Sequence, residues 1–189
     1  MNTTQQELIQ KGLKGMPAYA INELSGLKIE TKAGIARGAL AKNFNSKENY
    51  FLACYDFIVK ELLSANRSYL KQWSATTSNK ELTRQIWFNS IAWWLSEPHY
   101  FCFFRRFRLS KWYEERYEDI ILSAGAYTNL ARKGKDVSRF PDTLNNFAYE
   151  LVVEQIINVV NYLRRHPEWS TDTHFLKSTF EAMWASIQR

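Results

Sequence analysis

The segment from Ala33 to Glu48 has the residue types and the spacing of an element that reads nucleic acid. Arg37 and Lys42 are cations, which can bond base edges and phosphates. They share residues 36–44 with Leu40 and Phe44, which are four positions apart and therefore lie on one face of a helix. A short helix docked through its two apolar residues would present its basic side to a partner.

Turn and capping residues on both sides delimit this short helix. Ser25 can cap a helix that runs to Ala33, and Gly34 permits the positive φ of a tight helix exit. Asn45, followed three positions later by Glu48, has the pattern of a capping box and predicts a new helix start. Two helices joined by a short turn with a glycine fit a helix-turn-helix that enters the DNA major groove. Many small helical proteins also contain such turns, so the pattern alone leaves a purely structural role open.

The same residues resemble a known family. The string Ala-Gly-Ile-x-x-Gly-x-Leu-x-x-x-Phe-x-Ser-Lys-Glu, from Ala33 to Glu48, is similar to the DNA-binding domain of TetR/AcrR-type (tetracycline-repressor-like) transcriptional regulators. Ser25 and Ile29 extend the match to the preceding helix. The resemblance implies a helix-turn-helix DNA-binding domain over residues 1–50 and a helical effector-binding and dimerisation domain over residues 51–189.

The resemblance also implies which side chains bind DNA. Arg37 and Lys42 are expected in the major groove, with Arg37 at a guanine edge. Lys47 and Ser25 match positions that contact phosphates. Asn43 completes the expected DNA-binding set, at a position where His or Tyr is usual.

Besides Asn43, three further residues depart from the family pattern. Ala36 replaces the usual Ser or Thr that caps the recognition helix, and Ala41 replaces a phosphate-binding Tyr. Pro17 falls where the family has a continuous first helix and should interrupt it. Lost contacts should lower DNA affinity without changing the fold. They also support an alternative hypothesis, a helical ligand-binding or protein-interaction module of this fold that has lost specific DNA binding.

Composition agrees with a polyanionic partner. The net charge is +6 and the sequence pI is near 9.3. Residues 1–50 hold seven basic and four acidic residues, a balance of +3. No apolar run approaches the roughly 20 residues of a membrane span, and the N-terminus lacks a basic start and an apolar core. We therefore expect a cytoplasmic protein without a membrane partner. Cys54 and Cys102 lie in apolar helical patterns and favour buried, reduced thiols.

The rest of the chain has helical periodicity and no convincing strand pattern, so the predicted class is all-α. Further helices are expected at about 47–73, from the Ser78–Glu81 capping box to Glu97, at 111–133, at 144–164, and after a cap at Thr171 or Asp172. Residues 99–108 are aromatic and then basic.

The last two predicted helices bear on assembly. The apolar stripe between Leu144 and Arg164 is wider than one neighbouring helix needs. The resemblance implies that both helices pair with those of a second subunit in a four-helix interface. The expected interface residues are Leu151, Ile156, Val160, Leu163, Phe180 and Trp184. Periodicity alone leaves open that both helices only complete the core of a monomer.

A ring-rich region between residues 87 and 127 could line an apolar pocket. Its expected ligand-binding residues are Trp87, Trp94, His99, Phe103, Phe104 and Tyr127. For any single ring, ordinary core packing is the alternative. The sequence contains no Gly-rich phosphate loop, nucleophile elbow, HExxH pair or Cys-His cluster, so we expect neither catalysis nor a metal or cofactor. The predicted function is a homodimeric regulator, expected to repress, that reads an inverted repeat in double-stranded DNA and is released by a small, largely apolar effector.

Overall fold

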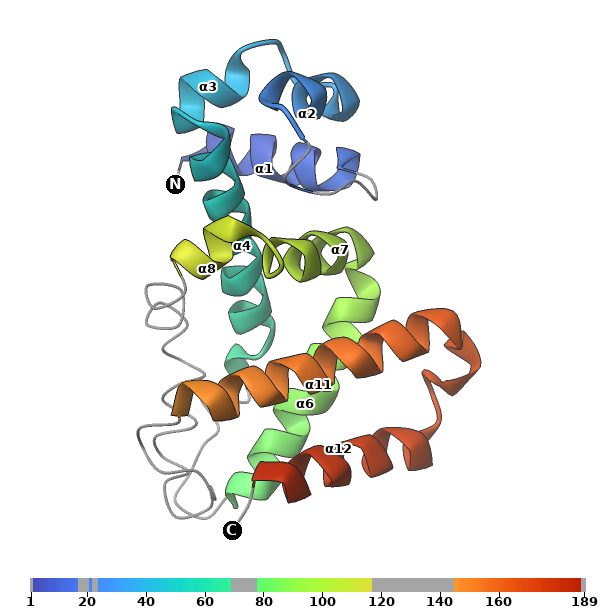
Figure 1. The fold of residues 1–189 in the computed structure, drawn as a ribbon. Helices are drawn as coiled ribbons and strands as arrows, with labels where there is room; N and C mark the ends of the chain where they lie inside the picture. Colours follow the sequence, from blue (N-terminus) through green and yellow to red (C-terminus); the bar gives the residue numbers. More distant parts are fainter. Residues whose placement is uncertain (1, 17–20, 22–23, 69–77, 117–144, 188–189) are drawn as a thin grey trace. The chain divides into compact units, whose positions relative to one another are not determined.

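The computed structural model describes residues 2–16, 21, 24–68, 78–116 and 145–187. Every regular element in these ranges is a helix (Figure 1), which confirms the all-α prediction. The helices are α1 (Thr3–Gly15), α2 (Gly26–Ala33), α3 (Ala39–Phe44), α4 (Lys47–Ala65), α6 (Asn79–Ser96), α7 (Pro98–Phe107), α8 (Lys111–Glu115), α11 (Asn145–Arg165), the 3-10 helix η3 (Pro167–Trp169) and α12 (Thr173–Ile187). None of the described helices combines the length and the apolar character that crossing a membrane requires.

The chain divides into two compact units. Unit 1 consists of residues 1–61 and 97–117, and unit 2 consists of residues 62–96 and 118–189. Unit 1 therefore combines the N-terminal helices with α7 and α8, which come much later in the sequence. The predicted boundary after residue 50 lies inside α4, so it stays a prediction about function and does not mark a break in the chain.

Helix α2 has the predicted cap and end, and α1 ends before Pro17. The hydroxyl oxygen of Ser25 accepts a hydrogen bond from the Lys28 backbone N–H at 3.2 Å and caps α2. Gly34 ends α2 with a φ of 60°, in the left-handed region that favours glycine. Helix α1 ends at Gly15, two residues before Pro17, as expected of a helix that a proline interrupts.

Helix α3 is shorter than the predicted 36–44. It begins at Ala39, because Gly38 has a φ of 81° and its left-handed backbone cannot continue a helix. Arg37 therefore lies in the turn before α3, and its predicted place on the helix was wrong.

The predicted cap of α4 was displaced by one residue, from Asn45 to Ser46, and it is a single side-chain cap and not a capping box. Ser46 Oγ accepts a hydrogen bond from the Asn49 N–H at 3.1 Å, so Ser46 caps α4. Asn45 instead ends α3, with a φ of 65°. Asparagine tolerates this left-handed conformation better than most residues, which explains its position in the turn.

Aromatic side chains from three helices form the core of unit 1. Phe51 and Tyr55 of α4 are buried against rings of α7 and α8. Tyr55 lies 5.0 Å from Phe107 between ring centroids, and Phe51 lies 5.4 Å from Trp112. The buried rings contributed by α7 and α8 are Phe101, Phe103, Phe104, Phe107, Trp112 and Tyr113. Helices α7 and α8 thus complete the core on which the N-terminal helices are built.

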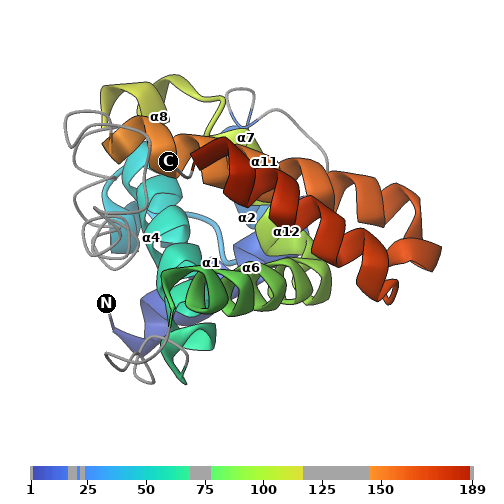
Figure 2. The same ribbon diagram turned by 90° about the horizontal axis from the view of Figure 1, so that it is seen from below.

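Three helices form the described part of the unit 2 core. In Figure 1, α6 runs across α11 and α12, and Figure 2 shows α11 and α12 side by side. The buried apolar residues of these three helices are Leu82, Ile86, Trp87, Ile91, Trp94, Ile157, Val160, Leu163, Phe180, Met183 and Trp184.

A small polar network lies inside this unit. Asn66 is fully buried, and its side-chain amide donates to the Leu62 carbonyl at 3.0 Å and to Ser90 Oγ at 3.2 Å. Asn89 donates to the Asn66 side-chain oxygen at 2.9 Å and to the Ala65 carbonyl at 3.1 Å. The network joins α6 to the chain around the end of α4, and it satisfies polar groups that would be costly to bury alone.

Other predicted helix limits were partly right. Helix α8 ends at Glu115, and Arg116 is its C-cap. The prediction of one continuous helix over 111–133 was therefore wrong. Residues 117–133 lie outside the described residues. The predicted break at His166–Pro167 is confirmed by the end of α11 and by η3. Asp172 Oδ1 accepts from the Phe175 N–H at 2.7 Å, so Asp172 caps α12, the second of the two predicted caps.

Candidate nucleic-acid interface

Helix α3 is docked by the two apolar residues that its spacing indicated. Leu40 and Phe44 are buried, and the Phe44 ring meets Tyr50 of α4 edge to face, with 5.1 Å between centroids. Lys42 and Arg37 are exposed. The short helix thus has one packed apolar side, while its cation and that of the preceding turn are free of that packing.

Two further candidate DNA contacts lie at helix starts. The Ser25 hydroxyl accepts a bond from Lys28 while it caps α2, and it can still donate its own proton to a phosphate. Lys47 begins α4, and its Nζ lies 5.1 Å from the centroid of the Trp112 ring. Lys111 approaches the same ring at 5.8 Å. A cation over an indole face is attracted by the ring quadrupole, so Trp112 restrains Lys47.

Asn43, a predicted DNA contact, already makes hydrogen bonds within unit 1. Its side-chain amide donates to the Ala39 carbonyl one turn earlier at 2.8 Å. Its backbone carbonyl accepts a bond from Gln5 Nε2 at 2.9 Å, which ties α1 to α3. The position of Asn43 therefore favours a structural role over base reading.

Sequence reasoning missed one residue of this site, Glu30 of α2. Its side chain is buried, with 4% of the residue exposed. Its carboxylate accepts hydrogen bonds from the backbone N–H groups of Gly38 and Leu40, each at 2.9 Å. The sequence offered only indirect evidence for this role. Neither Ala36 nor Gly38 has a side chain that can cap α3, so another part of the chain had to supply a hydrogen-bond acceptor.

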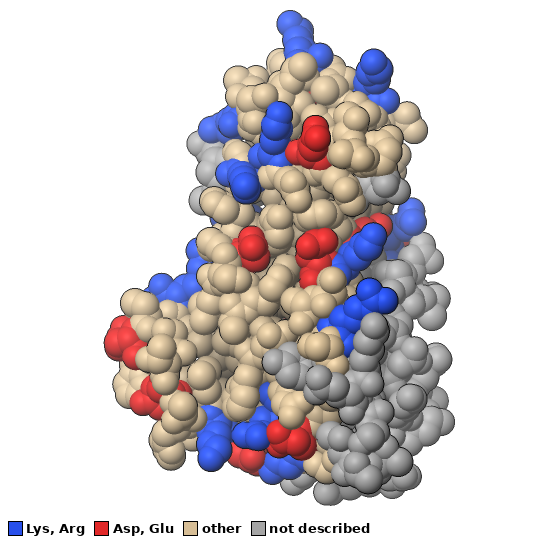
Figure 3. All heavy atoms as spheres, turned by 180° about the vertical axis from the view of Figure 1, so that it is seen from behind, with Lys and Arg blue, Asp and Glu red and all other residues tan. Residues whose placement is uncertain are grey.

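Basic side chains gather on the surface of unit 1. Figure 3 shows Lys and Arg side chains projecting from the part of unit 1 that carries α1, α2 and α3. The exposed basic residues of these helices and of the turn before α3 are Lys11, Lys14, Lys28, Lys32, Arg37 and Lys42. These exposed cations would attract a polyanion to this part of unit 1.

Comparison with known proteins identifies the fold. No protein-family model and no curated protein matches the sequence. A protein assigned to the TetR family of transcription regulators from Shewanella sp. PV-4 matches with a TM-score of 0.81 and 21% identity, over 100% of both chains. The chain has the TetR-family fold. A TetR-family transcription regulator from Marinobacter aquaeolei VT8 matches with a TM-score of 0.73 and 17% identity, over 98% of this chain and 96% of that chain.

Another solved structure that matches this fold is that of a repressor. NalD of Pseudomonas aeruginosa, the secondary repressor of the MexAB-OprM multidrug efflux pump, matches with a TM-score of 0.65 and 14% identity. The match covers 98% of this chain and 97% of NalD. The TetR-like fold therefore extends over both units, and the resemblance seen in residues 33–48 is confirmed at the level of the fold.

The residues expected to bind an effector are divided between the two units. Trp87 and Trp94 are buried in unit 2, whereas Phe103 and Phe104 are buried in the aromatic core of unit 1. His99 is exposed, and Tyr127 lies outside the described residues. Phe104 stacks on Tyr55 with centroids 5.5 Å apart, so the core alternative is favoured for the α7 rings.

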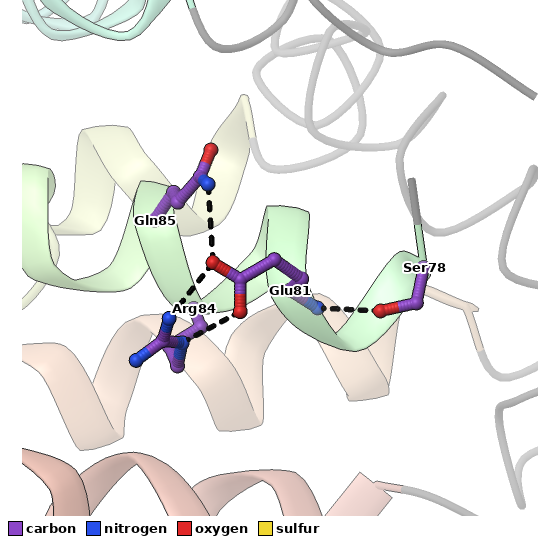
Figure 4. A network of polar contacts seen from close by, with 4 residues as sticks. All are labelled: Ser78, Glu81, Arg84 and Gln85. Atoms are coloured by element: carbon purple, nitrogen blue, oxygen red, sulfur yellow. Dashed lines mark hydrogen bonds and ion pairs between the residues drawn. The ribbon is translucent and has the colours of Figure 1, made fainter. Parts of the chain in front are cut away.

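Helix α6 carries both effector candidates of unit 2. Local hydrogen bonds define its first turn. Figure 4 shows Ser78 Oγ accepting from the Glu81 N–H at 3.2 Å, which confirms the predicted helix start. The Glu81 carboxylate accepts from the Arg84 guanidinium twice at 2.8 Å and from Gln85 at 3.1 Å. The bonds from Arg84 hold the pKa of the Glu81 carboxyl below its usual value.

The residues expected at a dimer interface also divide into two groups. Val160, Leu163, Phe180 and Trp184 are buried within the chain itself, in the core of unit 2. Leu151 and Ile156 of α11 are partly exposed. Periodicity defined one wide stripe, but it could not say which part of the stripe packs within the chain. In the described part of the chain, no three His, Cys, Asp or Glu side chains are grouped so that they could hold a metal ion.

Proposed function

We propose that the chain is a dimeric, ligand-responsive DNA-binding regulator that represses transcription by reading an inverted repeat. The observation that carries this proposal is the combination of a TetR-like fold with exposed cations on and beside α3, at Arg37 and Lys42. Ser25 and Lys47 are the proposed phosphate contacts on the two flanking helices. NalD, a repressor with this fold, supports the assignment of the class.

Selection of binding sites from random duplex DNA tests the proposal. We expect recovery of an inverted repeat whose half-sites are about 34 Å apart, since two α3 helices of a dimer must enter successive major grooves. The affinity for the recovered site should fall steeply with salt, because bound lysines and arginines release counterions from the phosphates. Flat, unspecific binding would instead favour the alternative, a helical ligand-binding or protein-interaction module that no longer reads DNA.

Arg37→Ala is expected to weaken binding to the selected site by about 1–3 kcal/mol and to relax one base preference. Lys42→Ala should lower affinity as well, since Lys42 is exposed on α3. Lys60→Ala is the matched control, because Lys60 is also exposed but lies roughly 20 Å along α4 from Lys47. Fluorescence anisotropy with the selected duplex measures all three, and an unchanged base preference in Arg37→Ala would remove that residue from the reading role.

The proposed dimer uses the partly exposed face of α11. We expect sedimentation equilibrium to give twice the chain mass of 22.3 kDa. Ile156→Glu should raise the dimer dissociation constant at least about tenfold, because it buries a charge in an apolar contact. Asn158→Glu adds the same charge at an exposed position two residues away and should leave the dimer intact. A wild-type monomer at micromolar concentration would contradict this arrangement.

A small, largely apolar effector is the proposed signal. Trp87 is buried, and its indole Nε1–H meets no hydrogen-bond acceptor within the described part of the chain. A buried donor without an acceptor is costly, which supports an effector that offers one polar acceptor on an otherwise apolar body. Trp87 is therefore the favoured effector contact among the six residues predicted from the sequence.

A further inference from the structure

The start of α3 lacks a cap of its own. The first N–H groups of any helix have no partner inside that helix. The N-cap residue here is Gly38, which has no side chain to offer, and Ala36 carries only a methyl group. The N–H of Leu40 is at a buried position, so leaving it without an acceptor would be costly.

Glu30 closes this gap from the preceding helix. One carboxylate oxygen accepts from Gly38 N–H and the other from Leu40 N–H, both at 2.9 Å. A negative charge at a helix N-terminus is also favoured by the helix dipole. The carboxylate thus does for α3 what a capping side chain at the N-cap position, residue 38, would do locally.

The backbone of Glu30 acts on the other side of the same turn. Its carbonyl oxygen accepts the Gly34 N–H that caps α2 and the Ile35 N–H at 2.8 Å. Glu30 therefore ends α2 with its main chain and begins α3 with its side chain. Because both bonds of the carboxylate run to backbone groups, they fix the position of α3 on α2 independently of the side chains that α3 exposes.

This arrangement has a consequence for DNA binding, and the inference rests on the proposed function. The N–H groups of Gly38 and Leu40 are committed to a carboxylate, so they are not free to bind a phosphate. We propose that Glu30 is the positioning residue that makes α3 selective: it holds α3 rigidly in register and keeps a negative charge at the helix start. Attraction of that end of α3 to the phosphate backbone of any sequence is thereby weakened.

Glu30→Gln tests the proposal with an isosteric change. The glutamine amide has one acceptor oxygen, and its NH₂ group opposes a backbone donor, so one of the two bonds is lost. We expect affinity for the selected duplex to fall about tenfold, while affinity for random duplex stays constant or rises because a negative charge is gone. Glu7→Gln removes an exposed carboxylate of α1 in the same unit and should leave the ratio of the two affinities unchanged. A variant that was only less stable would lose both affinities in proportion.

Amide hydrogen exchange without DNA tests the bonds separately. Exchange at Gly38 and Leu40 should become at least about tenfold faster in Glu30→Gln, while amides in α4 keep their wild-type rates. Unchanged exchange at both amides would overturn the proposal, even if DNA binding is confirmed. Faster exchange with an unchanged affinity ratio would also overturn the role in selectivity. If wild-type protein selects no DNA site, the proposed function fails, while the exchange result still tests the cap.

Glu30→Asp tests whether the charge alone is sufficient or whether the carboxylate must also reach the two N–H groups. It also replaces Glu30→Gln as the test if that variant does not fold. Aspartate keeps the negative charge but withdraws it by one methylene, so both bonds should weaken. We expect faster exchange at Gly38 and Leu40, a loss of affinity for the selected duplex, and no gain in affinity for random duplex. A gain for random duplex in Glu30→Asp would contradict the proposed effect of the charge.

Discussion

Phe107→Ala is expected to lower the free energy of unfolding of unit 1 by about 3–5 kcal/mol. Phe107 is fully buried in α7, and its ring centroid lies 5.0 Å from that of Tyr55 and 5.8 Å from that of Phe103. Tyr113 of α8 meets the same ring at 6.1 Å. Truncation would leave a cavity at the point where α4, α7 and α8 share a core, and the rings around it can collapse only partly.

Urea denaturation followed by circular dichroism measures this loss, and hydrogen exchange locates it. We expect faster exchange across residues 1–61 and 97–117, because the N-terminal helices share the core that Phe107 fills. Leu109→Ala is the matched control: Leu109 is two residues away but 79% exposed, so the change should stay within about 0.5 kcal/mol. Equal effects of the two substitutions would show that α7 does not support the N-terminal helices.

Features that depend on neighbouring residues in the sequence were predictable. Ser25, Ser78 and Asp172 cap their helices because a capping side chain bonds an N–H only three residues later. The apolar pair that docks α3 was recognised for the same reason, since Leu40 and Phe44 are one turn apart. The position of Arg37 was not, because the left-handed backbone of Gly38 delays the helix start by three residues from the predicted one.

Features that depend on distant residues were not predictable. The carboxylate of Glu30 accepts hydrogen bonds from residues eight and ten positions later in the sequence. The turn between them has a geometry that could not be derived from the sequence. Trp112 restrains Lys47 although 65 residues separate them. Likewise, the apolar stripe of α11 revealed how much surface is buried, but only packing against α6 and α12 decides that Val160 faces inward.

Gly15→Ala is expected to destabilise unit 1 by about 1–3 kcal/mol, the usual cost of overpacking. A Cβ at Gly15 would lie 2.5 Å from the Ala33 Cα and 2.8 Å from the Ala33 Cβ. The clash is largely with backbone at the end of α2, so no rotamer change can relieve it, and α1 and α2 must move apart. The better helix propensity of alanine offsets part of this cost, about 1 kcal/mol at most.

Gly26→Ala is the matched control, in the first turn of α2. A Cβ there would meet no atom within 4 Å, and the residue has no positive φ, so alanine should stabilise the protein by about 0.4–1 kcal/mol. Thermal unfolding of both variants decides between packing and propensity: if Gly15→Ala raises the melting temperature as Gly26→Ala does, the close contact of α1 and α2 is not required. The same two variants should also differ in DNA binding. The carboxylate of Glu30 in α2 bonds the start of α3, so a displaced α2 should move α3 with it. We therefore expect Gly15→Ala to bind selected and random duplex DNA with more similar affinities, whereas Gly26→Ala should keep the wild-type ratio of the two affinities.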